Sequence, residues 1–217
     1  MEVPGIRRVR LGSLEPRIIT EEFVNALKDQ EKFCPHFHLS LQSGCDATLK
    51  RMNRRYTAEE YYEKCVLLRE NFDHPALTTD VIVGFPGETE EEFAETVAFL
   101  KKVAFYETHI FKYSRRKGTK AAVMENQIPE ELKTKRSDIL LKLDKEHRKE
   151  YEAVLVGTEQ EVLFEEEVTI DRKDWFVGHT KEYVKIAVPA EENLANQLQM
   201  VKVSAERAGD LLAGEVR

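Results

Sequence analysis

Small and polar residues stand at the ends of four segments whose pattern predicts β-strands. These segments cover residues 6–11, 37–41, 77–84 and 106–113, and helical segments separate them. Parallel sheets bind ligands outside the carboxyl ends of their strands. One polar ligand would therefore meet four strand ends, which are Gly12-Ser13-Leu14, Ser40-Leu41-Gln42-Ser43-Gly44, Gly84-Phe85-Pro86-Gly87 and Tyr113-Ser114-Arg115-Arg116-Lys117.

Asp80 stands inside a strand that is otherwise apolar, in the run Thr79-Asp80-Val81-Ile82-Val83. A buried carboxylate needs a hydrogen-bond donor or a counter-charge. The residues leave two explanations open, a ribose diol of a bound ligand or a neighbouring residue of the chain, such as an arginine. The turn Gly84–Thr89 that follows needs no ligand to explain its residues, because its glycines shape the turn and Thr89 is the N-cap of the next helix.

Other kinds of chemistry have little support in the sequence. It contains no HExxH motif, no Walker loop and no Ser-His-Asp order. Cys34, Cys45 and Cys65 form no CxxC pair, which argues against a disulfide framework and against a zinc knuckle. His36 and His38 flank one residue and are interpreted as structural, so no metal ligands are predicted.

Composition narrows the class of protein. The 217 residues carry a net charge of −7, so no overall basic field attracts nucleic acid. The apolar stretches are far shorter than a membrane span, and the first residues lack a signal-peptide pattern. A reducing cytoplasm is the predicted location. Four local clusters of cations, at residues 7–10, 50–55, 115–120 and 133–136, are interpreted either as solvated helix ends or as a rim that faces phosphates.

The elements that must position these residues alternate between strand and helix. Thr20 is a predicted N-cap, and Thr57–Glu60 and Thr89–Glu92 each form a capping box. Four strands with intervening helices imply right-handed βαβ units and a parallel sheet. After Pro129, apolar residues keep a helical spacing to about residue 152, namely Leu132, Ile139, Leu140, Leu143 and Tyr151.

The sequence pattern changes near residue 154, from alternating strands and helices to short β-type runs. Short β-type runs at 161–168, 175–178, 183–188 and 200–205 predict a small antiparallel barrel. The predicted domains are therefore residues 1–153 and 154–217. The second carries 7 Lys/Arg against 13 Asp/Glu, a net charge of −6. From the residues alone, the chain is an α/β domain that binds a polar, nucleotide-like ligand, followed by a β-barrel.

Three stretches together resemble one family. HLSLQSGCDATLKRMNRRYT, TDVIVGFPGETEEEF and YSRRKGTKA are similar to segments of the radical S-adenosylmethionine methylthiotransferases. The stretch SLQSGCD resembles the branch that acts on threonylcarbamoyladenosine in tRNA. WFVGHTKEYVKIAV and the closing LLAGEV resemble the TRAM domain, an OB-like RNA-binding barrel. The resemblance implies the C-terminal part of a partial (β/α)6 barrel with about four parallel strands, followed by that domain.

The resemblance also implies roles for particular residues. Gln42, Arg54 and Asp80 would hold S-adenosylmethionine through its ribose and its amino-acid part, with Arg54 on the carboxylate. Ser13, Ser40 and Tyr113 are further candidates for this cofactor, and the backbone near Tyr113 would face adenine. The candidates for contact with tRNA, at its anticodon stem-loop, are Arg115, Arg116, Lys117, Lys181 and Lys185.

One departure from the family is large. The family's 4Fe–4S clusters need a CxxxCxxC motif and three further cysteines, and neither set is present in this sequence. We therefore expect a C-terminal portion of a cytoplasmic enzyme that methylthiolates C2 of the modified adenosine, and expect these residues alone to be inactive. The alternatives are a portion of a ribosomal-protein methylthiotransferase and a non-catalytic RNA-binding module. We also expect the sheet edge near Ile6–Leu11 to be covered by the termini or by self-association.

Overall fold

The structure, a computed structural model, describes residues 3–217 and divides into two compact units. One unit comprises residues 11–31 and 37–148. The other comprises residues 3–10, 32–36 and 149–217. Each unit is described by itself.

A four-stranded sheet forms the centre of the first unit, with the strand order β1-β2-β3-β4. The pairs Ser13–His38 and Asp80–His109 are parallel, as is an isolated bridge between Gln42 and Val81. The predicted parallel sheet is therefore confirmed. Its strands are β1 (Ser13–Leu14), β2 (His36–Leu39), β3 (Ala76–Val83) and β4 (Glu107–Lys112).

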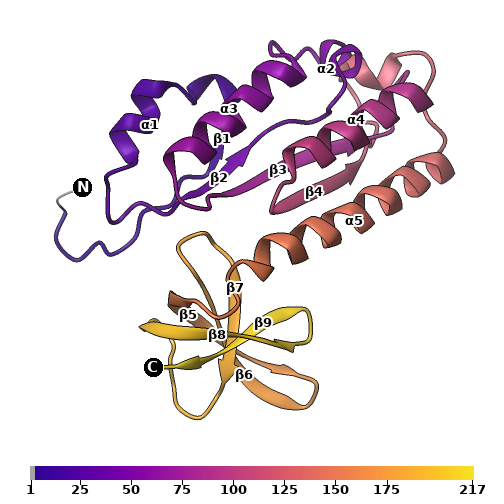
Figure 1. Ribbon diagram of the computed structural model, residues 1–217. Coiled ribbons are helices and arrows are strands. Elements are labelled where there is room, and N and C mark those ends of the chain that lie inside the picture. Colours follow the sequence, from indigo (N-terminus) through magenta and orange to yellow (C-terminus); the bar gives the residue numbers. More distant parts are fainter. Residues whose placement is uncertain (1–2) are drawn as a thin grey trace. The chain divides into compact units, whose positions relative to one another are not determined.

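Helices connect these strands, and α1, α3 and α4 lie over the same face of the sheet (Figure 1). The fifth helix runs along β4, where the Asp144 carboxylate accepts a 2.6 Å hydrogen bond from the Thr108 amide. The helices of the chain are η1 (Pro16–Ile18), α1 (Glu21–Leu27), α2 (Asp46–Arg51), α3 (Ala58–Asn71), α4 (Glu90–Val103), η2 (Lys120–Val123) and α5 (Glu130–Ala153).

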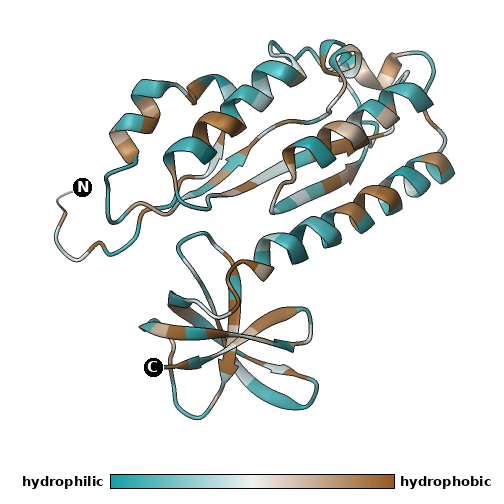
Figure 2. Cartoon of the chain, viewed as in Figure 1, coloured by the Kyte–Doolittle hydropathy of each residue, from teal (hydrophilic) through white to brown (hydrophobic). Residues whose placement is uncertain are grey.

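Local chemistry explains where these helices begin. The hydroxyl of Thr20 accepts from the amide of Phe23 at the start of α1. Thr57 and Thr89 form complete capping boxes with Glu60 and Glu92, as predicted. The helices show hydrophilic and hydrophobic faces (Figure 2), and the inner faces bury their side chains against the sheet.

Buried hydroxyls join the helices to the sheet. Tyr61 on α3 is fully buried and donates to the carbonyl of Leu39 at 2.9 Å. Thr79 on β3 donates to the same carbonyl. Burial raises the pKa of Tyr61 well above its ordinary value, so the phenol stays a donor. These bonds fix β2 against β3 and so fix the strand ends that follow.

The prediction of a strand at residues 6–11 was wrong. In this segment only Val9 pairs, through an isolated bridge to Phe33, and the edge strand is the two-residue β1. The alternation in residues 6–11 comes from arginines with their own partners. Arg8 donates to the carbonyl of His179 at 2.8 Å and pairs with Glu161 in the same compact unit.

The second unit contains a closed barrel with the strand order β5-β6-β7-β9-β8. The pair β7–β9 is parallel and the other pairs are antiparallel, so the barrel is mixed and not wholly antiparallel as predicted. Val177, Ala187 and Ala208 are buried in its core. The strands are β5 (Glu159–Ile170), β6 (Lys173–His179), β7 (Lys185–Pro189), β8 (Leu198–Ala208) and β9 (Leu211–Val216).

Among the described residues, no helix combines the length and the apolar character that crossing a membrane requires.

Candidate functional site

Two adjoining cavities lie at the carboxyl ends of β3 and β4. The larger has a volume of about 580 Å³, in the range of small-molecule sites, and the smaller about 270 Å³. They share four lining residues, namely Gln42, Ile82, Phe85 and Ala121. Asp80 and Tyr113 line the larger cavity and Arg54 lines the smaller. Four residues predicted to bind the cofactor therefore line these two adjoining cavities, which we together call the pocket.

Gln42 enters the pocket because its backbone is fixed to β3. Its amide donates to the carbonyl of Asp80 at 2.8 Å, and its carbonyl accepts from Ile82 at 3.0 Å. Its φ is +74°, in the left-handed region that glutamine rarely adopts. Such strain persists only where the surroundings impose it, and it is common at ligand sites.

Asp80 is paired on the exposed side of the sheet. One carboxylate oxygen lies 3.3 Å from Nε2 of His38, and Nδ1 of that ring lies 3.0 Å from the Thr78 hydroxyl. The sequence left open a ribose or a neighbouring residue as the partner of Asp80, and in the structure the neighbouring residue His38 pairs with it. The carboxylate also lines the pocket, so this pairing orients it there.

His109 stacks on His38 with ring centroids 5.6 Å apart, next to Asp80. The potential ligand atoms of His38, Asp80 and His109 lie within 4.8 Å of one another. The 3.3 Å separation of Nε2 of His38 from the Asp80 carboxylate is that of an ion pair, and His109 meets His38 by ring stacking, so we interpret the cluster as a group that orients Asp80.

Arg54 reaches the smaller cavity from the segment after α2. Its guanidinium has a loose ion pair with Glu15, at 3.8 Å, and its side chain is about one-third exposed. The neighbouring Tyr56 donates to the carbonyls of Ser40 and Leu41 at 2.7 and 2.8 Å. Burial raises the pKa of Tyr56 to about 12, so it remains a donor and holds the end of β2. A guanidinium with a weak partner is available to an anionic ligand group.

Among the described pocket residues, Tyr113 and Arg51 each have a buried polar atom without a hydrogen-bond partner, the Tyr113 hydroxyl and Nε of Arg51, and Tyr113 lines the larger cavity. The Tyr113 ring meets Phe85 edge to face, with centroids 5.3 Å apart. A buried hydroxyl without a partner costs about 1–3 kcal/mol, and a ligand atom would remove that cost. This observation fits an organic ligand that has polar atoms.

Close packing positions the loop after β2. Gly44 lies against α4, where an added Cβ would be 2.6 Å from Cβ of Phe99. Its amide donates to the hydroxyl of Thr96, which also meets the hydroxyl of Ser43 at 3.2 Å. The small residues Ser43 and Gly44 therefore let the strand end approach α4, and this approach places Gln42 in the pocket.

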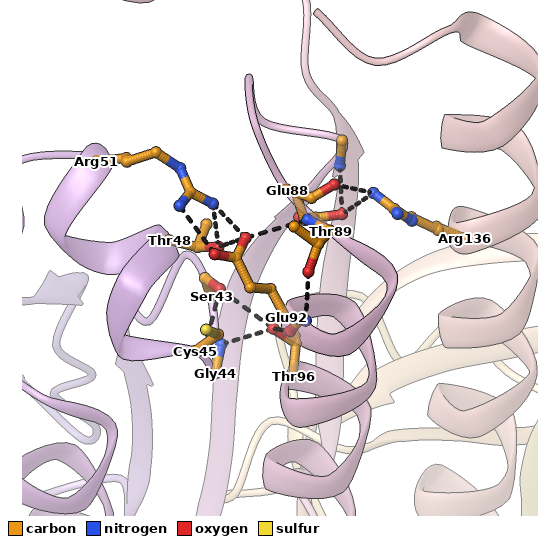
Figure 3. Close-up of polar contacts among 11 residues, drawn as sticks. Ser43, Gly44, Cys45, Thr48, Arg51, Glu88, Thr89, Glu92, Thr96 and Arg136 are labelled. Atoms are coloured by element: carbon orange, nitrogen blue, oxygen red, sulfur yellow. Dashed lines mark hydrogen bonds and ion pairs between the residues drawn. The ribbon is translucent and has the colours of Figure 1, made fainter. Parts of the chain in front are cut away.

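Glu92 ties α2 to α4 (Figure 3). Its carboxylate accepts from both terminal nitrogens of Arg51, from the Thr48 hydroxyl and from the Thr89 amide. The hydrogen bonds from Arg51 hold the pKa of Glu92 below its ordinary value. The sequence predicted the capping role of Glu92 but not its partner Arg51, which is 41 residues away.

A second ion pair, also in Figure 3, is almost wholly buried. Arg136 on α5 donates to the Glu88 carboxylate at 2.6 Å, and the same oxygen accepts from the Gly84 amide at 3.0 Å. Burial raises the pKa of Glu88, while both donors oppose that shift. Sequence reasoning missed Arg136. The available signal was its position four and seven residues before Leu140 and Leu143, which are buried on one face of the helix.

The other residues predicted to bind the cofactor or tRNA do not all lie at the pocket. Ser13 and Ser40 line neither of the two cavities. Arg116 lines the larger cavity, whereas Arg115 donates to Gln127 at 2.9 Å and Lys117 is exposed. Lys181 and Lys185 belong to the unit that contains the barrel.

The cysteines of this chain do not fit an iron–sulfur cluster. Cys34 precedes β2, Cys45 precedes α2, and Cys65 lies within α3, all buried. Burial raises the pKa of each thiol, that of Cys65 to about 12. A cluster needs thiolates that converge on one point. The side chains around the pocket do fit S-adenosylmethionine, because they include an unpaired hydroxyl, a loosely paired guanidinium and a carboxylate.

Comparison with known proteins agrees with this description. The family model of the Radical SAM superfamily matches residues 3–100. The solved structure of coproporphyrinogen III oxidase (HemN) from Escherichia coli, described as a radical SAM enzyme, resembles the chain with a TM-score of 0.54. That match has 19% identity and covers 64% of this chain and 32% of that structure, so it supports the fold alone.

Curated relatives match along nearly the whole chain. The tRNA-2-methylthio-N(6)-dimethylallyladenosine synthase of Acetivibrio thermocellus is 39% identical over 216 residues. The threonylcarbamoyladenosine tRNA methylthiotransferase MtaB of Bacillus subtilis is 39% identical over 202 residues. The matches cover 100% and 93% of this chain but 45% of each relative, so the chain spans about half of their length. The chain therefore matches the radical SAM superfamily over residues 3–100 and is homologous along nearly its whole length to radical SAM tRNA methylthiotransferases.

Proposed function

We propose that this chain carries the S-adenosylmethionine site of a tRNA methylthiotransferase. One observation supports the proposal above the others. Gln42, Arg54, Asp80 and Tyr113 come from separate segments and line the two adjoining cavities of the pocket, at the ends of parallel strands. That is where ligands of such sheets bind. When it is bound together with an iron–sulfur cluster, this cofactor supplies the radical and the methyl group for methylthiolation.

Each pocket residue is proposed to bind a different part of the ligand. Arg54 pairs with the carboxylate of the ligand, and the side chain of Gln42 bonds its ribose or its amino-acid part. Asp80, held by His38, accepts from a ribose hydroxyl. Tyr113 donates its unpaired hydroxyl to a ligand atom, while Phe85 and Ile82 cover the apolar faces. These residues bind and orient the ligand, and cluster ligands would have to come from outside these 217 residues.

The substrate that we propose is N6-threonylcarbamoyladenosine in tRNA, methylthiolated at C2 by a cytoplasmic enzyme of which this chain is part. The stretch SLQSGCD supports this choice, and a curated relative with that activity is 39% identical. A relative that acts on dimethylallyladenosine is equally identical, so the experiment must separate the two nucleosides. Residues 154–217, with Lys181 and Lys185, are proposed to contact RNA at the anticodon stem-loop, as are Arg115, Arg116 and Lys117. Self-association through the edge of the sheet is a further proposal.

Mass spectrometry of nucleosides from total tRNA tests the substrate. Wild type is compared with a strain that lacks the gene, and with that strain complemented by the wild-type or the D80N gene. We expect loss of 2-methylthio-threonylcarbamoyladenosine, accumulation of its unthiolated precursor, and rescue by the wild-type gene alone. Loss of the dimethylallyl product instead would move the substrate to that nucleoside. An unchanged profile would contradict a tRNA substrate and favour a ribosomal protein or a pure binding role.

A further inference from the structure

Two walls of the pocket depend on the first turns of α5. Phe85 follows β3 and Tyr113 follows β4, and their rings meet with centroids 5.3 Å apart. Both residues line the larger cavity. Strand pairing ends at Val83 and Lys112, and the Tyr113 amide makes one further bond to the Val83 carbonyl at 2.9 Å. Other groups must therefore fix the aromatic corner that the two rings form.

Lys133 on α5 contacts both strand ends. It is 9% exposed, and its ammonium donates to the backbone carbonyl of Tyr113 at 2.8 Å. Its aliphatic stem lies against Gly84, where φ is +71° and an added Cβ would overlap that stem. A long cation that buries its stem and uses its charge on a main-chain carbonyl is held in place by both contacts.

Arg136 lies one helical turn further along the same face. It is 1% exposed and donates to the Glu88 carboxylate at 2.6 Å and to the Glu88 carbonyl at 3.2 Å. The Glu88 carboxylate in turn accepts from the Gly84 amide. The other terminal nitrogen of Arg136 donates to the Glu90 carboxylate at 2.7 Å. The Glu88 carboxylate, which Arg136 holds, therefore closes the turn that carries Phe85 by binding the Gly84 amide at its other end.

We propose that Lys133 and Arg136 are positioning residues for the pocket. They hold the strand ends so that Phe85 and the unpaired Tyr113 hydroxyl face the ligand, and this inference rests on the proposed function of that pocket. Lys133 acts on Tyr113 through its carbonyl and on Phe85 through Gly84. Arg136 acts on Phe85 through Glu88.

Calorimetric titration of the 217-residue chain with S-adenosylhomocysteine tests the proposal. K133M keeps the stem that packs on Gly84 and removes the donor to Tyr113. We expect its affinity to fall about five- to tenfold, as for a lost charge-assisted hydrogen bond. K133R restores a donor and should recover most of the affinity. K135M, which changes an exposed lysine of the same helix, is the matched control and should bind as wild type.

Thermal melts by circular dichroism accompany each titration, and binding is measured where all variants are fully folded. This separates positioning from a general loss of structure. R136M removes the partner of a buried carboxylate and is expected to unfold more readily. The affinity of K133M is therefore the measurement that tests positioning. Wild-type affinity in K133M, or an equal loss in K135M, would overturn the proposal.

Amide hydrogen exchange keeps the two proposals distinguishable. The Tyr113 amide donates to Val83 and the Gly84 amide donates to Glu88. In K133M we expect faster exchange at both amides and unchanged exchange at the buried Leu39 of β2. If the wild-type chain does not bind S-adenosylhomocysteine, the proposed function of the pocket fails. The exchange result still decides the positioning, since unchanged rates at Tyr113 and Gly84 would refute it.

Discussion

The backbone amide of Gln42 donates a 2.8 Å hydrogen bond to the carbonyl of Asp80. This bond joins two residues that are 38 positions apart and that both line the pocket. Because it is a main-chain bond, their spacing is set by the register of the sheet. Side-chain substitutions at either position should therefore change ligand contacts while they leave that spacing intact.

Tyr113→Phe should separate ligand binding from stability. The hydroxyl has no partner in the unliganded protein, so its removal should leave the free energy of unfolding unchanged or slightly higher. Affinity for S-adenosylhomocysteine should fall about five- to tenfold if the hydroxyl donates to the ligand. Urea unfolding and calorimetric titration measure the two quantities. Y62F, on the outer part of α3, is the control, and a destabilised Y113F with normal affinity would contradict this role.

Arg54→Met should discriminate between ligands by their carboxylate. S-adenosylhomocysteine has a carboxylate for the guanidinium, whereas 5′-methylthioadenosine has none. Affinity for the first should fall about tenfold, and affinity for the second should stay at the wild-type value. Titration of both ligands into R54M and into R55M, which changes a neighbouring exposed arginine, checks this. Equal losses for the two ligands would place Arg54 elsewhere in the site.

Gly44→Ala should destabilise the first unit. An added Cβ would meet Cβ of Phe99 at 2.6 Å and Cα of Thr96 at 3.0 Å, so helix and loop must separate. We expect a loss of about 1–3 kcal/mol in the free energy of unfolding, as for overpacked cores. G12A is the matched control, because its Cβ would meet nothing within 4 Å. Equal unfolding midpoints for the two variants would show that the loop moves freely.

Glu92→Gln should have an effect that depends on pH. Arg51 lowers the pKa of Glu92 from its ordinary value of about 4.5, so the ionised form stabilises the fold. That contribution is complete above about pH 4.5 and is lost as pH falls through the lowered pKa. Near neutral pH, E92Q should cost about 1–2 kcal/mol, and the difference from wild type should shrink in acid. Unfolding curves across pH, with E63Q as control, measure this, and a difference independent of pH would contradict the ion pair.

Local sequence signals predicted much of the fold. The capping boxes at Thr57 and Thr89 and the β-branched run in β3 gave the correct elements, because each depends on neighbours in the chain. The strand prediction for residues 6–11 was wrong because alternation alone does not show whether a strand has a partner. Arg8 instead binds groups more than 150 residues away.

The candidate site was predictable in two ways. Gln42, Asp80 and Tyr113 stand in or after predicted strands whose carboxyl ends converge, whereas Arg54, which follows α2, was named from the family resemblance. Lys133 and Arg136 could not be named, since their partners Tyr113 and Glu88 lie 20 and 48 residues away. Ile139, which the helical pattern assigned to the buried stripe, is 42% exposed, whereas Lys133 is buried. Tertiary contacts, not hydropathy, decide which face of α5 is covered.

An NMR titration of the isotope-labelled chain with S-adenosylhomocysteine tests the central claim most directly. The account predicts saturable shifts centred on the amides of Gln42, Gly84 and Tyr113, with no such shifts in D80N. Absence of shifts in the wild-type chain, or shifts confined to the barrel strands β5–β9, would contradict the assignment of the pocket.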